Sequence, residues 1–132
     1  MKLVIPLDPT GMSHNRLDKL HWTVKRDIKA QWTDAVQWIA QSKWSKLPMK
    51  YPTVTYTAYF KTRHKRDQDN FMAGLVKYSI DGLTKAGVIE DDNSDEIDLR
   101  PIEFAYDKTK PRVEITLEVK AEAPESHSKP PE

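Results

Sequence analysis

The sequence predicts an α+β fold, a single domain in which two helices pack on a small mixed β-sheet in the order β-α-β-α-β-β. Three observations predict it. Two segments carry apolar residues at helical spacing, several short segments alternate apolar and polar residues, and a length of 132 residues suits one domain. Cysteine is absent, which excludes a disulfide scaffold and any thiolate metal site.

The first half of the chain is expected to form a strand, a helix and a second strand. Lys2–Leu7 is a short apolar run that predicts a strand, and Pro6 favours an edge or bulge position. Thr23–Lys43 predicts a helix because its apolar residues recur on one helical face. These residues are Ile28, Trp32, Ala35, Val36 and Ile39. Thr53–Phe60 alternates cleanly and is rich in β-branched and aromatic residues, which predicts a strand.

The second half is expected to form a helix and a C-terminal β-hairpin. Asn70–Ala86 predicts the helix, and Gly87 is expected to end it just after the C-cap. Its predicted buried stripe consists of Met72, Leu75, Val76, Ser79 and Leu83. The alternating residues of 102–106 and 113–119 predict two strands, and the intervening Asp107–Arg112 predicts the turn of a hairpin.

The expected domain covers residues 1–120, and the Pro/Glu-rich segment 121–132 is expected to be a disordered tail. No run approaches the ~18 apolar residues of a membrane span, and the start of the chain does not resemble a signal peptide. We therefore expect a cytoplasmic protein with no membrane partner.

Charge is segregated along the chain although the formal net charge is only +1. Lys61–Lys77 holds five Lys or Arg residues against two Asp, whereas Tyr78–Asp98 holds one Lys against seven Asp or Glu. A basic patch next to carboxylates is what a metal-dependent enzyme acting on polyanions needs. Solvated loops of opposite sign explain the same pattern equally well.

Two pairs of aspartates are candidate metal ligands. Asp67 and Asp69 lie between a predicted strand and a predicted helix, and Asp91 and Asp92 follow that helix. Asp69 also suits an N-cap, which would explain it without a metal. If the two pairs meet, their oxygen-only ligands favour a hard cation such as Mg²⁺ or Mn²⁺, and metal-assisted phosphodiester hydrolysis is the matching chemistry.

Other candidate residues have two interpretations each. Lys77 lies four residues before Asp81, so it is either half of a surface ion pair or a phosphate contact. Trp32 lies on the apolar helix face and is expected in the core. The remaining tryptophans are expected at a dimer interface, partly in the core, or in contact with DNA; these are Trp22, Trp38 and Trp44.

The motif KRDQDN (Lys65–Asn70), followed by Lys77 and by DGLTKAGVIEDD (Asp81–Asp92), resembles the signature of RusA-type Holliday-junction resolvases. The resemblance is strong over about residues 61–92 and weaker at HNR (His14–Arg16) and at KPRVEITLEV (Lys110–Val119). It implies a small homodimeric Mg²⁺-dependent endonuclease, common in prophages, that acts in DNA recombination and repair.

The resemblance implies roles for individual residues. Asp67, Asp69 and Asp92 match the three catalytic acids that bind Mg²⁺, with Mn²⁺ expected to substitute, and Asp91 is a possible auxiliary ligand. Lys77 matches the catalytic lysine of the helix, although four extra residues separate it from Asp69. The expected contacts to DNA phosphates are Lys61, Arg63, Lys65, Arg66 and Lys85, with Arg16 and Arg112 as weaker candidates.

The function expected from the resemblance is resolution of four-way junctions and other branched DNA by paired symmetric nicks. The ends would carry 5′-phosphate and 3′-hydroxyl groups, no nucleotide cofactor would be needed, and the cell would be bacterial or phage-infected. Two alternatives stay open at this stage. One is a DNA-binding accessory protein that does not cleave, and the other is an interaction domain whose charge pattern is incidental.

Overall fold

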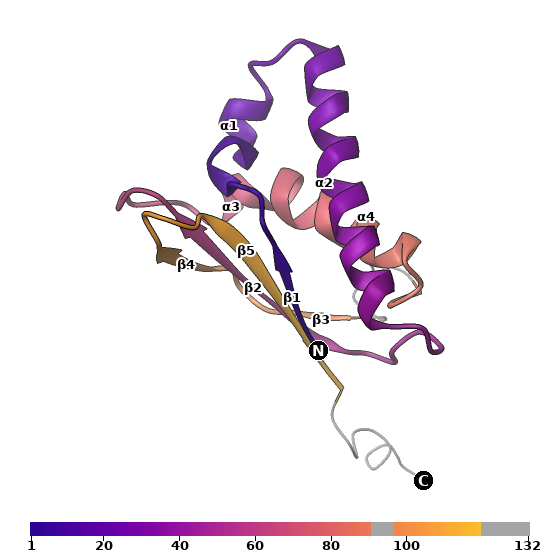
Figure 1. Ribbon diagram of the computed structural model, residues 1–132. Coiled ribbons are helices and arrows are strands. Elements are labelled where there is room, and N and C mark those ends of the chain that lie inside the picture. Colours follow the sequence, from indigo (N-terminus) through magenta and orange to yellow (C-terminus); the bar gives the residue numbers. More distant parts are fainter. Residues whose placement is uncertain (91–96, 120–132) are drawn as a thin grey trace, which may run out of the picture.

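The structure is a computed structural model that describes residues 1–90 and 97–119. In this part of the chain the elements form a small α+β domain, as the sequence predicts, with a mixed five-stranded sheet. The helices lie together on one face of the sheet (Figure 1). The predicted boundary at residue 120 and the predicted tail 121–132 lie outside the described residues.

The elements follow the predicted order with additions. The strands are β1 (Lys2–Ile5), β2 (Thr53–Phe60), β3 (Asp98–Leu99), β4 (Glu103–Tyr106) and β5 (Arg112–Glu118). The helical segments are the 3-10 helix η1 (Pro9–Met12), α1 (His14–Leu17), α2 (Trp22–Lys43), α3 (Asp69–Phe71), the π-helical η2 (Met72–Val76) and α4 (Lys77–Lys85). The prediction for β2 is confirmed at both ends, and that for α2 is confirmed to within one residue.

Strand β2 lies inside the sheet, and this position overturns the predicted C-terminal hairpin. β4 runs parallel to β2 on one side, and β5 runs antiparallel to β2 on the other. β1 pairs with the far side of β5, also antiparallel. The turn between β4 and β5 passes over the end of β2, where the Asp107 N–H donates to the Phe60 carbonyl at 2.8 Å. The two strands are therefore separated by β2 and do not pair.

Strands β3 and β4 occupy the same edge of β2 as two consecutive pieces. β3 pairs with Thr53 and Val54, and β4 pairs with residues 57–60. Pro101 lies in the gap between them, where its missing N–H cannot continue the ladder. Pro101 therefore marks an interruption of this edge strand.

The core lies between the sheet and the helices. Every second residue of β2 is buried, in the same core cluster as Trp32, Val36 and Ala40 of α2. The buried residues of β2 are Val54, Tyr56, Ala58 and Phe60. The alternate residues of β2 are three threonines and a tyrosine, and they face away from the helices. This half-polar face is typical of a sheet with solvent on one side.

The predicted second helix is present, but it is interrupted by η2. Leu75, Val76, Ser79 and Leu83 are buried as predicted, whereas Met72 is 40% exposed. The wider π turn shifts the direction of the side chains, which explains why the α-helical period misplaces Met72. The η2 segment therefore separates α3, the first turn of the predicted helix, from α4.

The C-terminal end of α4 is closed as predicted. Gly87 has φ +80°, the left-handed region in which glycine is favoured. Its N–H donates to the Thr84 carbonyl and the Val88 N–H donates to the Leu83 carbonyl, both at 3.1 Å. This pair of bonds is a Schellman motif, which directs the chain away from α4 toward Met49.

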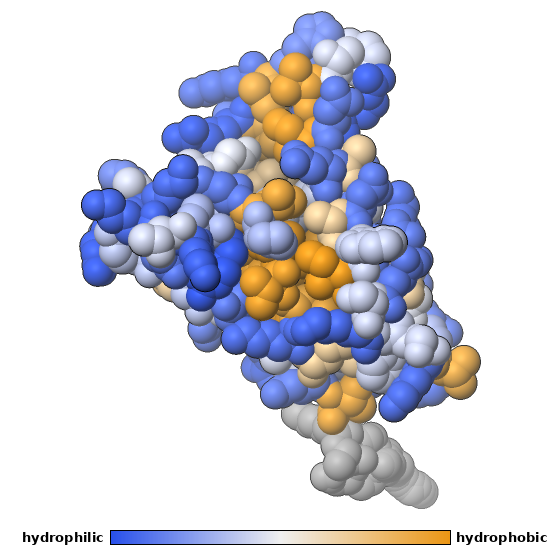
Figure 2. Space-filling view, viewed as in Figure 1, coloured by the Kyte–Doolittle hydropathy of each residue, from blue (hydrophilic) through white to orange (hydrophobic). Residues whose placement is uncertain are grey.

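The face shown in Figure 2 is largely hydrophilic, with its broadest apolar area where α2 and β1 lie side by side and smaller ones elsewhere. A small hollow of about 270 Å³ lies between α2 and the segment that follows β1, and Leu7, Met12, Ile28 and Trp32 are among its lining residues. Across residues 1–90 and 97–119, no helix has the length and apolarity needed to cross a membrane.

Candidate functional site

A polar hollow of about 380 Å³ lies beyond the Phe60 end of β2. Three separate parts of the chain line it: the segment around η1 and α1, the loop 61–68, and the first turn of α3. Its polar lining residues are Thr10, Ser13, Arg16, Thr62, His64, Lys65, Arg66, Asp67 and Asn70. The structure thus brings Arg16 together with the KRDQDN motif, from which it is distant in the sequence.

Asp67 organises the turn that carries both aspartates. Its Oδ1 accepts the Asp69 N–H at 3.1 Å, and its backbone carbonyl accepts the Asn70 N–H at 3.1 Å. Helix α3 has no side-chain cap bond, so the alternative explanation of Asp69 as an N-cap is not observed. Asp69 instead lies exposed in the first turn of α3, where the positive end of the helix favours a carboxylate.

Asn70 connects the aspartate turn to α1. Its Oδ1 accepts the Asn15 backbone N–H at 3.1 Å, across 55 residues of sequence. Arg16 follows directly, and its own N–H donates to Ser13 Oγ at 3.3 Å. The bond between Asn15 and Asn70 therefore holds the arginine of α1 beside the aspartates, and sequence reasoning had assigned no role to either asparagine.

Close packing at Gly74 also fixes the helical run after the aspartate turn against the η1–α1 segment. A Cβ atom at this position would lie 2.5 Å from Leu17 Cδ1 and 2.7 Å from the Met12 carbonyl oxygen. Such contacts leave no room for a side chain. The π-helical segment η2 is therefore seated directly against the η1–α1 segment.

Arg66 folds back onto its own loop. Its Nη1 donates to the carbonyls of His64 at 3.1 Å and Thr62 at 3.3 Å, and its guanidinium lies 3.7 Å from the centre of the Phe60 ring. Partial burial and the nearby charge of Arg16 lower the pKa of Arg66. Arg66 was predicted to contact DNA phosphates. In the structure its guanidinium instead binds and stabilises its own loop.

The other cations of the loop differ in their contacts. Lys61 Nζ lies 3.5 Å from an oxygen of Asp8, and Arg63 lies 4.1 Å from the centre of the Tyr106 ring. Lys65 is exposed and lines the hollow. Of the predicted phosphate contacts in this loop, Lys65 is the one whose position beside Asp67 suits that role best.

Arg112 lies elsewhere. It is on β5, opposite Tyr59 in the register, with its guanidinium 3.8 Å from the centre of the Tyr59 ring. It donates to Asp107 Oδ2 and to Glu114 Oε2, both at 2.8 Å. The Arg112 hydrogen bond, with those from the backbone of residues 109 and 110, lowers the pKa of Asp107 to about 2.

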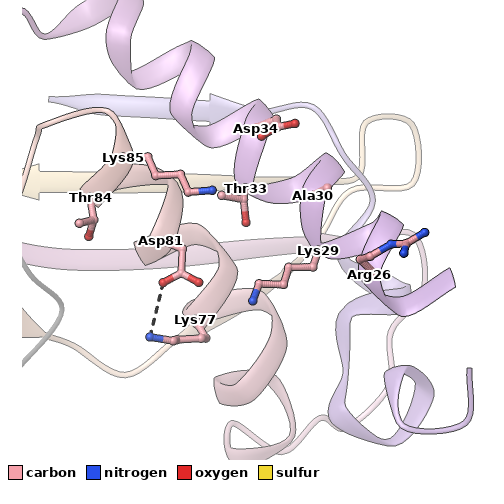
Figure 3. Close-up of a pocket in the computed structure, with 9 residues that line it drawn as sticks. All are labelled: Arg26, Lys29, Ala30, Thr33, Asp34, Lys77, Asp81, Thr84 and Lys85. Carbon is pink, nitrogen blue, oxygen red and sulfur yellow. Dashed lines mark ion pairs between the residues drawn. The ribbon is translucent and has the colours of Figure 1, made fainter. Parts of the chain in front are cut away.

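Lys77 and Lys85 line a different groove, between α2 and α4. Lys77 Nζ lies 3.4 Å from Asp81 Oδ1, so the ion pair considered from the sequence is present (Figure 3). The residues that line the polar hollow do not include Lys77. The structure therefore separates Lys77 from Arg16 and Lys65.

Asp91 and Asp92 lie outside the described residues. The described chain on either side is at the Thr53 end of β2, where the Met49 N–H donates to the Val88 carbonyl and the Asp98 N–H to the Pro52 carbonyl. Eight residues of strand, about 23 Å, separate this end from the aspartate turn. Within residues 1–90, Val88 and Ile89 do not return toward Asp67.

The donor set can be compared with what a hard cation requires. Among the described residues, no three carboxylate or imidazole groups come together to hold a metal ion. Asp67 and Asp69 are two oxygen donors on one short turn. Mg²⁺ is often held by one or two carboxylates with water in its other positions, so this pair fits it.

The structure also shows where the four tryptophans lie. Trp32 is 3% exposed, and its Nε1 donates to the buried Ser79 Oγ at 2.8 Å, which confirms its expected core position. Trp22 and Trp38 are exposed, and Trp44 is half-buried.

Comparison with known proteins adds nothing to the assignment of the candidate site, because no family model and no curated protein matches the chain.

Proposed function

We propose that this protein is a Mg²⁺-dependent endonuclease of the RusA type that nicks branched DNA. The observation that carries the proposal is the polar hollow at the end of β2, where Asp67 lies beside Arg16 and Lys65. Carboxylates next to cations suit an enzyme that holds a metal ion and a phosphodiester side by side. The resemblance of Lys65–Asn70 and Asp81–Asp92 to that family points to the same chemistry.

Asp67 and Asp69 would hold the Mg²⁺ ion. When bound, the ion supplies stabilisation of the negative charge that develops on the phosphate oxygens during hydrolysis. Asp67 would act in two ways, because one of its oxygens already orders the turn through the Asp69 N–H. Arg16 and Lys65 would hold backbone phosphates on either side of the scissile bond, which positions the DNA without reading its sequence.

The proposal includes a homodimer in the cytoplasm, which would place two sites on one four-way junction. The distance along β2 between the aspartate turn and the flanks of residues 91–96 favours a site completed by Asp92 of a second copy. Mixing Asp69→Asn with Asp92→Asn protein tests this. A shared site leaves one intact site in each mixed dimer and yields single nicks, whereas a site within one chain yields none.

The main test uses a labelled synthetic four-way junction incubated with Mg²⁺ or with EDTA. We expect paired symmetric nicks with Mg²⁺ alone, and a loss of at least about 100-fold in Asp69→Asn, since even indirect partners of a metal cost 10–100-fold. Asp27→Asn is the matched control, because Asp27 is an exposed aspartate on α2 and lies outside the turn that carries Asp67 and Asp69. Equal nicking by Asp69→Asn and by the parent protein would show that the site is wrongly assigned.

A binding protein that does not cleave is the second candidate. The cations that line the polar hollow would hold DNA phosphates in such a protein as well. In that case no Mg²⁺-dependent nicks appear. Asp69→Asn then binds the junction more tightly than the parent protein, because it removes a carboxylate that repels the DNA phosphates.

A further inference from the structure

A second basic surface lies between α2 and α4, outside the polar hollow. It is a groove of about 580 Å³, whose charged lining residues are Arg26, Lys29, Asp34, Lys77, Asp81 and Lys85. Lys29 and Lys85 extend from the two facing helices into the space between them (Figure 3). The four cations exceed the two carboxylates, in a chain whose total formal charge is only +1. The groove therefore concentrates positive charge.

The two walls of the groove are fixed relative to one another. A Cβ atom on Gly82 would lie 2.7 Å from the Thr33 carbonyl oxygen and 2.7 Å from Val36 Cβ, so α4 crosses α2 in direct backbone contact. Thr33 Oγ1 also donates to the Tyr78 carbonyl at 3.3 Å. The two helices that carry the cations therefore need not rearrange when a ligand binds, which favours affinity.

The spacing of the cations matches a nucleic-acid backbone. Lys77 and Lys85 are eight residues apart on α4, which is about 12 Å along the helix axis. One strand of duplex DNA carries one phosphate per ~3.4 Å of its helix axis, so a duplex whose axis runs along α4 presents three to four phosphates of one strand over this distance. Lys29 contributes a further cation from the opposite wall.

We propose that the α2–α4 groove binds the phosphate backbone of a second arm of the branched DNA, in addition to the arm held at the polar hollow. The inference depends on the proposed function for its ligand. The two surfaces are joined by the helical run from α3 to α4, which borders the hollow with Asn70 and the groove with Lys77. A branched substrate can occupy both, whereas a short linear duplex can occupy one.

The test measures equilibrium binding in EDTA to a four-way junction and to a short linear duplex, at several salt concentrations. The variant is Lys29→Gln/Lys85→Gln, and the matched control is Lys46→Gln/Lys50→Gln, which removes two exposed cations outside both surfaces. Loss of two phosphate contacts should reduce the slope of log K against log salt by roughly 1.8. The difference in junction affinity between variant and parent should then narrow by roughly 12-fold from 50 to 200 mM salt.

A second variant, expected to raise the affinity for the junction, excludes misfolding as the cause of the change. Asp34→Asn removes a negative charge at the groove without touching any cation, so junction affinity should rise. The proposal is overturned if Lys29→Gln/Lys85→Gln has the slope of the control, or if its loss is as large on the short duplex as on the junction. A loss of affinity for poly-glutamate without a loss for DNA would instead assign the groove to an acidic protein partner.

The proposed function and this inference fail separately. Absence of nicking in Mg²⁺ together with the expected change of slope in EDTA would reject the nuclease and retain the groove. Normal nicking by the parent protein with an unchanged slope in the variant would retain the nuclease and reject the groove. A parent protein that binds neither DNA would reject both.

Discussion

The Asn15 backbone N–H donates to Asn70 Oδ1 at 3.1 Å, and this bond joins α1 to the turn that carries Asp67 and Asp69. Because the two residues are 55 positions apart, the bond is a tertiary contact and not a local cap. It holds Arg16 beside the aspartates, so the geometry of the polar hollow depends on it.

Asn70→Ala removes the acceptor of this bond. We expect the free energy of unfolding to fall by about 1 kcal/mol, the usual net value of one hydrogen bond, and nicking to fall further than stability explains. Asn70→Asp keeps an acceptor oxygen and is the control for stability, although its added charge beside Asp67 makes it unsuitable as a control for nicking. The measurement is urea unfolding of both variants alongside junction nicking by Asn70→Ala, and equal unfolding of the two variants would show that the acceptor is irrelevant to stability.

Gly74→Ala should destabilise the protein by about 1–3 kcal/mol, because the added methyl group meets Leu17 and the backbone of Met12. Gly11→Ala is the matched control in the adjoining segment, since its Cβ would meet nothing within 4 Å. That change should be neutral, or stabilising by about 0.4–1 kcal/mol. Thermal unfolding of the two variants distinguishes a packed glycine from a tolerant one, and a stable Gly74→Ala would contradict the close contact.

Arg66→Gln and Lys65→Gln should differ in kind although they remove neighbouring charges. Arg66 binds two carbonyls of its own loop and lies over Phe60, so its replacement should lower both thermal stability and DNA affinity. Lys65→Gln should leave the melting temperature unchanged and reduce the salt slope by ~0.9, the contribution of one phosphate. Unchanged stability in Arg66→Gln would mean that the folded-back arginine contributes nothing to the loop.

The Asp107–Arg112 pair predicts a pH dependence of stability. The Arg112 hydrogen bond lowers the pKa of Asp107 from 3.8 to about 2, so the folded state favours the ionised carboxylate. A depressed pKa gives stability that is fully present above about pH 4 and is lost as the pH falls from 3.8 toward 2. Asp107→Asn should therefore be less stable than the parent protein at pH 6, and the difference should shrink toward pH 2 in urea unfolding. A difference that stays constant over this range would rule out the pair as its source.

Local patterns in the sequence were sufficient for the long elements. The helix of residues 22–43 and the strand of residues 53–60 each repeat one period many times, so their type and bounds are well determined. The apparent hairpin was wrong because a short turn between two alternating segments says nothing about a third strand lying between them. Strand partners depend on contacts between distant residues, such as Asp107 with Phe60.

The candidate site shows the same division. The sequence placed Asp67, Lys65 and Arg16 among its candidates, and the structure gathers these three at one hollow. It gave no sign that Arg66 turns back toward Phe60, because that contact is set by the path of the loop. The sequence pattern also singles out neither Arg26 nor Lys29. Their role in a groove depends on the crossing of α2 over Gly82, which no local pattern encodes.

The position of β5 has a consequence for the order of folding. In the described part of the chain, β1 pairs with β5 and with no other strand, and the paired residues lie more than a hundred positions apart in the sequence. During synthesis, β1 emerges from the ribosome more than a hundred residues before β5, so the two strands cannot pair until that whole stretch has been made. Closing so long a loop is slow, so we expect late completion of the sheet to limit the rate at which the native state appears.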